Sequence, residues 1–207
     1  MPKGKRELLR KVDVPEGKSG DWEVSRFEAT EEDIRLHNLR ERIHRTYRFM
    51  EAGVYTKLTH RGKIVMSDTL AELRDHREPA RRTRDDRGDP EYPNHVLVNG
   101  LGLGVVAQAI LDEPTVDSLT VIEKSEDVIA LVSGHYKCRY GDRLIVVCAD
   151  AFDWKPPKGQ RYRVVWHDIW NDICADNLPE MHKLHRKYGR RCDWQGSWCR
   201  RMCETRK

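Results

Sequence analysis

The sequence has no long apolar run, and hydrophobic residues make up only 38% of its 207 positions, while charged residues make up 35%. No stretch approaches the roughly 20 apolar residues that a membrane-spanning helix needs. Residues 1–6 are basic, but no apolar core of a signal peptide follows them. We therefore expect a cytoplasmic protein with no membrane partner. Its length suffices for one sizeable core with a small appendage.

The close cysteine spacing of structural zinc sites is also lacking. Gaps of six residues precede Cys192 and Cys199 in the series of histidines and cysteines near the C-terminus, at His182, His185, Cys192, Cys199 and Cys203. Structural zinc ligands usually come in pairs two to four residues apart. We expect no metal site. In a cytoplasmic chain we expect the six cysteines to stay reduced.

The N-terminal third reads as an appendage. Residues 1–29 are polar, with turn-forming residues at 15–20, and predict a flexible arm. Thr30 with Asp33 three residues later predicts a capping box. An amphipathic helix ended by Gly53 should follow and pack on the core through near-helically spaced apolar residues, at Ile34, Leu39, Ile43, Tyr47 and Met50.

Two β-prone runs, 54–59 and 64–67, surround a glycine-containing turn and predict a hairpin. Ser67, Asp68 and Thr69 can cap a short helix that runs to about His76. The charged, proline-containing stretch 78–94 predicts a linker and a domain boundary. The expected organisation is an arm, a helix-and-hairpin region with its linker, and a core domain, at 1–29, 30–94 and 95–207.

Strands and helices alternate from residue 95 onward. The expected strands are 95–99, 119–123, 143–148 and 162–167, and the expected helices are 105–111, 126–136 and about 176–188. This alternation predicts an α/β fold whose mainly parallel sheet has crossover helices on both faces. A basic tail rich in cysteine and tryptophan is expected to follow the last helix.

Polar and glycine residues gather at the predicted strand ends. Residues 100–104 read Gly-Leu-Gly-Leu-Gly, so Gly100, Gly102 and Gly104 can bring backbone N–H groups and a helix N-terminus close to a ligand. Glu123 follows about 20 residues later, where an acid can accept both hydroxyls of a ribose. A dinucleotide fold prefers Gly or Ala at the position of Val105, which disfavours NAD.

Candidate ligand-binding residues also follow the later predicted strands. Asp150, Ala151 and Phe152 follow the third strand. The order of these motifs resembles class I S-adenosylmethionine-dependent methyltransferases, and the resemblance covers about residues 95 to 188. It implies a Rossmann-like fold and S-adenosylmethionine as the cofactor. The glycines would face its methionine part and Glu123 its ribose. Asp150, Ala151 and Phe152 would surround its adenine.

The fourth strand end would face the acceptor. Asp168 could act as a general base or hold a substrate amine. His167 could relay a proton, and Asp172 is a further acidic candidate. The chain is most similar to spermidine synthase and its relatives, whose small β-domain the hairpin resembles. It differs from them at Leu103, Ser125 and Asn171, where that family has acidic residues.

Three functions follow from these patterns. The first is methyl transfer from S-adenosylmethionine to an acceptor that the sequence does not identify. The second is aminopropyl transfer from decarboxylated S-adenosylmethionine. The third is non-catalytic binding of nucleic acid through the basic tail, where arginines alternate with Trp194 and Trp198. We favour a solvated basic face over nucleic acid for this tail, and a homo-oligomer stays open.

Overall fold

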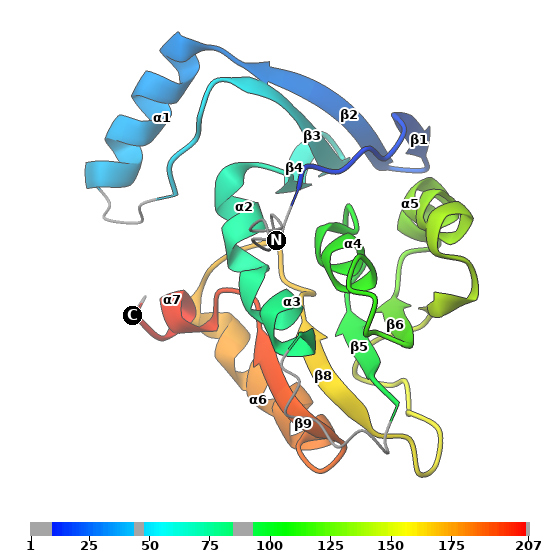
Figure 1. The fold of residues 1–207 in the computed structure, drawn as a ribbon. Helices are drawn as coiled ribbons and strands as arrows, with labels where there is room; N and C mark the ends of the chain where they lie inside the picture. The colour runs from blue at the N-terminus through cyan, green and yellow to red at the C-terminus, as the bar shows by residue number, and fades with distance from the viewer. Residues whose placement is uncertain (1–9, 44–47, 85–92, 206–207) are drawn as a thin grey trace, which may run out of the picture.

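The computed structural model describes residues 10–43, 48–84 and 93–205. Two sheets organise them (Figure 1). The smaller one is antiparallel, in the order β1-β2-β3-β4. Its strands are β1 (Gly17–Ser19), β2 (Trp22–Ala29), β3 (Gly53–His60) and β4 (Lys63–Ser67).

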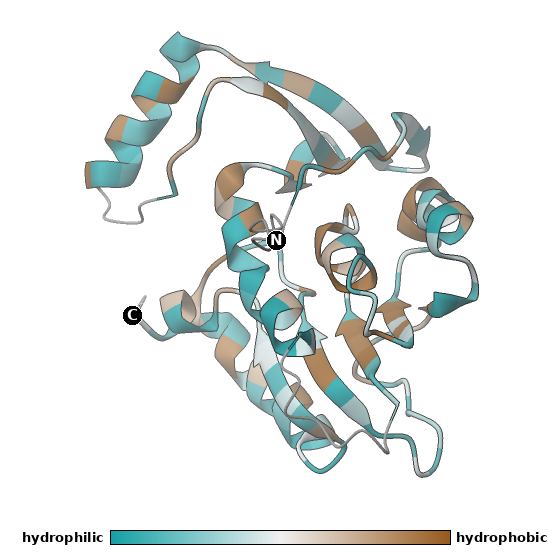
Figure 2. Cartoon of the chain, viewed as in Figure 1, coloured by the Kyte–Doolittle hydropathy of each residue, from teal (hydrophilic) through white to brown (hydrophobic). Residues whose placement is uncertain are grey.

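The larger sheet is entirely parallel, in the order β7-β6-β5-β8-β9. Val96, Leu97 and Val98 of its central strand are fully buried, as expected where both faces of a sheet are covered. Figure 2 shows this apolar centre. The strands are β5 (His95–Asn99), β6 (Ser118–Glu123), β7 (Leu144–Cys148), β8 (Tyr162–His167) and β9 (Cys192–Ser197).

Helices cover both faces of this sheet, so the Rossmann-like α/β prediction is confirmed. One face packs against α3 (Arg77–Thr83), α4 (Val105–Leu111) and α5 (Glu126–Tyr140). The other face packs against α6 (Leu178–Tyr188). Single 3₁₀ turns at Gly141–Arg143 and Ala175–Asn177 complete the crossovers. In the part of the chain that the structure describes, no helix has the length and apolarity to cross a membrane.

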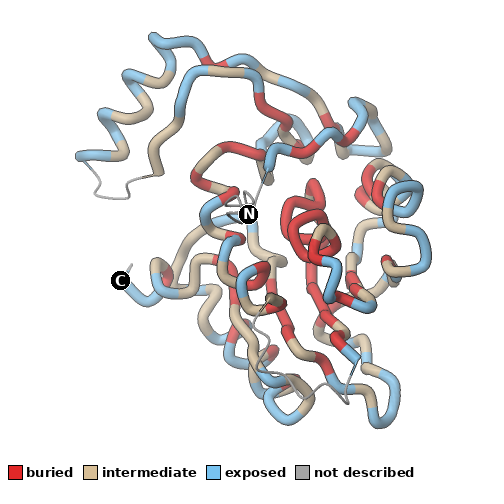
Figure 3. Tube along the Cα trace, viewed as in Figure 1, coloured by how far each residue is buried: buried red, intermediate tan, exposed pale blue. Residues whose placement is uncertain are grey.

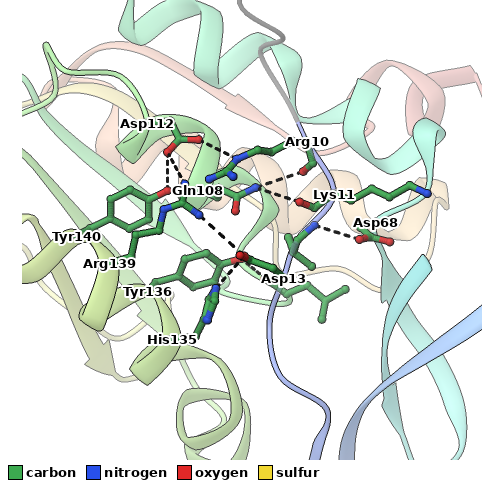
Figure 4. Close-up of polar contacts among 12 residues, drawn as sticks. Arg10, Lys11, Asp13, Asp68, Gln108, Asp112, His135, Tyr136, Arg139 and Tyr140 are labelled. Carbon is green, nitrogen blue, oxygen red and sulfur yellow. Dashed lines mark hydrogen bonds and ion pairs between the residues drawn. The ribbon is translucent and has the colours of Figure 1, made fainter. Parts of the chain in front are cut away.

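The prediction of a flexible arm over 1–29 is wrong for its second half. β2 pairs with β3 along its whole length, with Trp22 opposite His60, and its Val24 and Ala29 are buried. Residues 10–14 run between the small sheet and the helices α4 and α5 (Figure 4). There the Val12 N–H donates to Asp68 Oδ2 at 3.1 Å. Residues 1–9 lie outside the described part.

The helix predicted from Thr30 exists, but its packing was mispredicted. Asp33 N–H donates to Thr30 Oγ1 at 3.3 Å and Thr30 N–H to Asp33 Oδ2 at 3.0 Å, which is the expected capping box. The helix α1 is Glu31–Ile43, shorter than predicted, and none of its residues is buried. Figure 3 shows it projecting from the end of the β2–β3 ribbon, where no core is available. Tyr47 lies outside the described residues.

The two segments that follow the hairpin are both helical at the start, although only the first was predicted to be a helix. The short helix α2 (Leu70–Asp75) was expected, although Thr69 makes no capping hydrogen bond through its side chain. The supposed linker begins with α3, whose Pro79 and Ala80 are buried against the core, so this part is no boundary loop. Residues 85–92 lie outside the described part.

The basic tail is also part of the fold. Its first half forms β9, which pairs in parallel with β8, and its second half forms α7 (Arg200–Thr205). Trp194 stacks on Trp166 with ring centroids 6.2 Å apart. Tryptophan burial at the sheet edge therefore explains much of the tail's aromatic content.

Candidate functional site

A cavity of about 280 Å³ lies at the carboxyl ends of the parallel strands, under the small sheet. In open α/β sheets this edge is where ligands bind. The cavity collects seven of the predicted site residues: Gly100, Gly102, Glu123, Asp150, Ala151, Phe152 and Asp168. Gly104, His167 and Asp172 do not line it.

The glycine loop follows β5 with its backbone in conformations that favour glycine. Gly100 has φ +99°, and a Cβ there would lie 1.9 Å from the carbonyl oxygen of Asp168. The backbone of the loop therefore packs directly against the backbone that follows β8. Gly104 has φ +75° and precedes α4, where a Cβ would collide with the ring of Tyr136. Its role is close packing on α5, and of the three glycines only Gly100 and Gly102 line the cavity.

Glu123 joins two elements at the end of β6. Its Oε2 accepts the N–H of Leu101 at 2.9 Å, and its Oε1 accepts the N–H of Ser125 at 2.9 Å. The carboxylate thereby ties the glycine loop to the start of α5. A carboxylate has about four lone-pair sites, so two stay available for hydroxyl groups of a ligand in the cavity.

The segment after β7 forms a fixed wall. Asp150 Oδ1 accepts the N–H of Phe152 at 2.7 Å, which orients the loop. Lys187 Nζ donates to the carbonyl oxygens of Ala151 and Phe152 at 2.8 and 3.0 Å. Lys183 Nζ lies 4.8 Å from the centre of the Phe152 ring on α6's side. An acid beside an apolar ring suits a heterocycle with an exocyclic amine.

Asp168 occupies the opposite end of the cavity. Its N–H donates to the carbonyl of Asn99 at 2.8 Å, and its Oδ2 lies 3.5 Å from His76 Nε2. Burial raises the pKa of this carboxyl well above its usual range, and the nearby carboxylates of Glu72, Asp75 and Glu123 raise it further. Asp168 is therefore a better proton acceptor than an exposed aspartate.

His167 and Asp172 do not take the roles that the sequence suggested. The His167 ring is fully buried toward α6, with Nδ1 2.7 Å from the side-chain amide nitrogen of Asn99. Burial lowers its pKa to about 3, so it stays neutral and away from the cavity. Asp172 uses its carbonyl oxygen to accept a hydrogen bond from Asn177 at 2.6 Å. For His167 the physical reason is alternation: neighbouring residues at a strand end point to opposite faces.

Sequence reasoning missed an entire side of the cavity. Glu72 of α2 and His76, which joins α2 to α3, line it, as does Trp198 beyond β9. The small sheet adds Met66, whose Sδ accepts the N–H of Leu103 at 3.3 Å above the glycine loop. No sequence motif identifies these residues, because only the tertiary fold brings them to the cavity.

The histidines and cysteines near the C-terminus do not converge. Arg200 lies between two of the histidines, with Nη1 3.1 Å from His185 Nδ1 and Nη2 3.3 Å from His182 Nε2. Within residues 10–43, 48–84 and 93–205, no group of three or more His, Cys, Asp or Glu side chains is placed to hold a metal ion.

No protein-family model and no curated protein sequence matches the chain. Among solved structures, it is similar to the CcbJ methyltransferase from Streptomyces caelestis, with a TM-score of 0.41 and 21% identity over 55% of this chain and 47% of that one. It is also similar to the plantazolicin methyltransferase BpumL in complex with SAH, with a TM-score of 0.39 and 17% identity over 58% and 42%. The N-terminal domain of EvdMO1 with SAH bound gives a TM-score of 0.41 and 18% identity over 58% and 48%. The chain spans less than half the length of each.

Proposed function

We propose that the protein is an S-adenosylmethionine-dependent methyltransferase. The observation that carries the proposal is the single cavity in which the glycine loop, Glu123 and Asp150 meet. These groups come from three strand ends, and each has the chemistry that one part of the cofactor needs. Gly100 and Gly102 line the part of the cavity that we assign to the methionine moiety, Glu123 offers acceptors for ribose hydroxyls, and Asp150 with Phe152 offers an acid and a ring face for adenine.

The bound cofactor would supply an electrophilic methyl group on a sulfonium ion. The protein then needs to hold the acceptor in line with that group and to take up a proton if the acceptor carries one. Asp168 stands at the end of the cavity away from Asp150 and is the residue we assign to the acceptor side.

The test is calorimetric titration with S-adenosylmethionine, S-adenosylhomocysteine, decarboxylated S-adenosylmethionine and NAD. We expect binding of the first two. The variants Glu123→Gln and Asp150→Asn keep side-chain shape and should each weaken binding by about tenfold, the loss of one charged hydrogen bond. Glu126→Gln, on the exposed start of α5, is the matched control. Wild-type affinity in both site variants would refute the assignment.

The same titration separates the alternatives. A clear preference for the decarboxylated cofactor would replace methyl transfer by aminopropyl transfer. Preference for NAD would indicate an oxidoreductase.

A further inference from the structure

A buried histidine in the cavity has no hydrogen-bond partner within the described part of the chain. His76 is fully buried and lines the cavity, yet among the described residues neither ring nitrogen makes a hydrogen bond. The nearest acidic oxygen, Asp168 Oδ2, lies 3.5 Å from Nε2. Burying an imidazole without partners is costly, and such groups usually serve a ligand or a reaction.

The charges around His76 are unbalanced. Arg48 Nη2 donates to Glu72 Oε1 at 2.7 Å and Nη1 pairs with Asp75. Asp168 adds a third carboxyl beside them. Burial raises the pKa of Glu72 to about 7 and that of Asp168 well above its usual range, so Arg48 does not fully balance these carboxyls. A further positive charge in the cavity would favour their ionised forms. Glu123 and Asp150 also line the cavity, and both already accept hydrogen bonds from backbone N–H groups.

Aromatic rings line the same end. Trp170 and Trp198 line the cavity near Asp168, and Trp170 is held by a hydrogen bond from its Nε1 to Glu180 at 2.7 Å. Across the cavity, Trp22 stacks on His60 with ring centroids 4.4 Å apart. Indole faces attract cations and pack well against apolar groups.

We infer that the cavity between Glu72, His76 and Asp168 is the acceptor subsite and that it takes an organic amine, which enters as its ammonium cation. This inference rests on the proposed methyltransferase function and specifies its substrate class. The ammonium supplies the missing positive charge, and its apolar part lies against the tryptophans. A carboxylate acceptor would add a further negative charge beside these acids, and a neutral alcohol would supply no charge to pair with them.

The residues also provide a route for the proton. An ammonium group cannot act as a nucleophile until it loses a proton. The Asp168 carboxylate, whose ionised form the bound ammonium favours, takes that proton and becomes a carboxylic acid, while the nitrogen keeps the electron pair of the broken N–H bond. His76 accepts a hydrogen bond from the new carboxylic acid, because burial and the charge of Arg48 hold its pKa near 3 and keep the ring neutral.

The experiment uses three probes of one shape and different charge: phenethylamine, 2-phenylethanol and 3-phenylpropionate. Each is titrated by ligand-detected NMR into the full chain saturated with S-adenosylhomocysteine. We expect the amine to bind about tenfold or more tightly than the other two. Glu72→Gln and Asp168→Asn should each weaken amine binding by about tenfold, as expected for one lost charge interaction.

Glu78→Gln is the control, because Glu78 lies on α3 outside the cavity and pairs with Arg81 and Arg82. It should leave amine binding unchanged. All variants are first checked for S-adenosylhomocysteine binding, which shows that they are folded and that the cofactor end is intact. Equal binding of the alcohol or the acid, no binding of the amine, or unchanged amine affinity in both site variants would overturn the inference. Failure of the wild-type protein to bind S-adenosylhomocysteine would instead overturn the proposed function.

Discussion

At the scale of single residues, the glycine loop tolerates the least change. Gly100→Ala would place a methyl group against the carbonyl of Asp168, in a backbone conformation that alanine avoids. We expect a loss of about 2 kcal/mol or more in the free energy of unfolding, measured by urea denaturation.

Gly134→Ala is its control. Gly134 lies inside α5 with no atom within 4 Å of a new Cβ, so alanine should raise stability by about 0.5–1 kcal/mol. A Gly100→Ala variant as stable as wild type would show that the loop does not lie so close to β8.

Buried histidines should make the protein sensitive to acid. Burial depresses the pKa of His167 to about 3 in the folded state, against about 6.5 in the unfolded chain. The folded state then binds fewer protons, so its stability is full above pH 6.5 and falls as the pH drops from there toward 3. Between pH 7.5 and pH 5.0 the loss from this residue is about 2 kcal/mol.

The variant His167→Gln should therefore lose about 2 kcal/mol less than wild type over that interval, whatever its stability at pH 7.5. Urea unfolding at both pH values measures the difference. His182→Gln removes an exposed histidine of α6 and serves as the comparison. An identical pH dependence in wild type and His167→Gln would contradict the buried neutral ring.

At the scale of elements, the segment 10–14 and the hairpin depend on one carboxylate. Asp68 is buried and accepts the N–H groups of Val12 at 3.1 Å and Thr56 at 2.7 Å. Asp68→Ala leaves both N–H groups buried and unpaired, which should cost about 2–4 kcal/mol in unfolding free energy. Asp142→Ala, at an exposed 3₁₀ turn, should change stability by less than about 0.5 kcal/mol.

For the helix α1 we expect the opposite result, a substitution with little effect on stability. Leu39 is 55% exposed although it lies on the apolar side of the helix. Leu39→Gln should therefore change the unfolding free energy by less than about 0.5 kcal/mol. Leu184→Ala, in the buried face of α6, should cost about 2–5 kcal/mol in the same urea assay. A large loss for Leu39→Gln would mean that α1 packs on the protein in solution.

These elements show which features can be predicted from sequence. Strands such as Val96–Val98 carry continuous apolar runs, and Thr30 with Asp33 marks a helix start locally, so both were predictable. The apolar pattern of α1 predicts which side of the helix is apolar, but it does not show whether another element covers that side. The strand β9 reads Cys-Asp-Trp-Gln-Gly-Ser, with no strand-like apolar pattern, and forms because β8 offers it an edge.

The same limit applies to the site. Gly100, Glu123 and Asp150 follow predictable strands, and parallel strand ends meet at one edge, so their convergence could be predicted. Glu72 and His76 come from a short helix whose position depends on long-range packing. Side-chain direction at Asp168 and His167 also needed the structure, because a one-residue change at a strand end selects the other face.

At the scale of the whole molecule, the cavity joins the two sheets. Trp22, His60 and Met66 of the small sheet line it together with Glu123 and Asp150 of the parallel sheet. A ligand bound there contacts both parts and should stabilise them together. At 100 times its dissociation constant, S-adenosylhomocysteine should add about 2.7 kcal/mol to the unfolding free energy.

Hydrogen exchange can locate this stabilisation. Bound S-adenosylhomocysteine should slow amide exchange in the glycine loop and also in β3 and β4, although no backbone pairing joins the small sheet to the large one. Met66 is a direct link at the cavity, because its Sδ accepts the N–H of Leu103. Met66→Ala should weaken the protection of β4 while the protection of the β6 end at Glu123 persists. Protection confined to the parallel sheet in the wild-type protein would mean that the small sheet does not close over the ligand, and that the cavity is open on that side in solution.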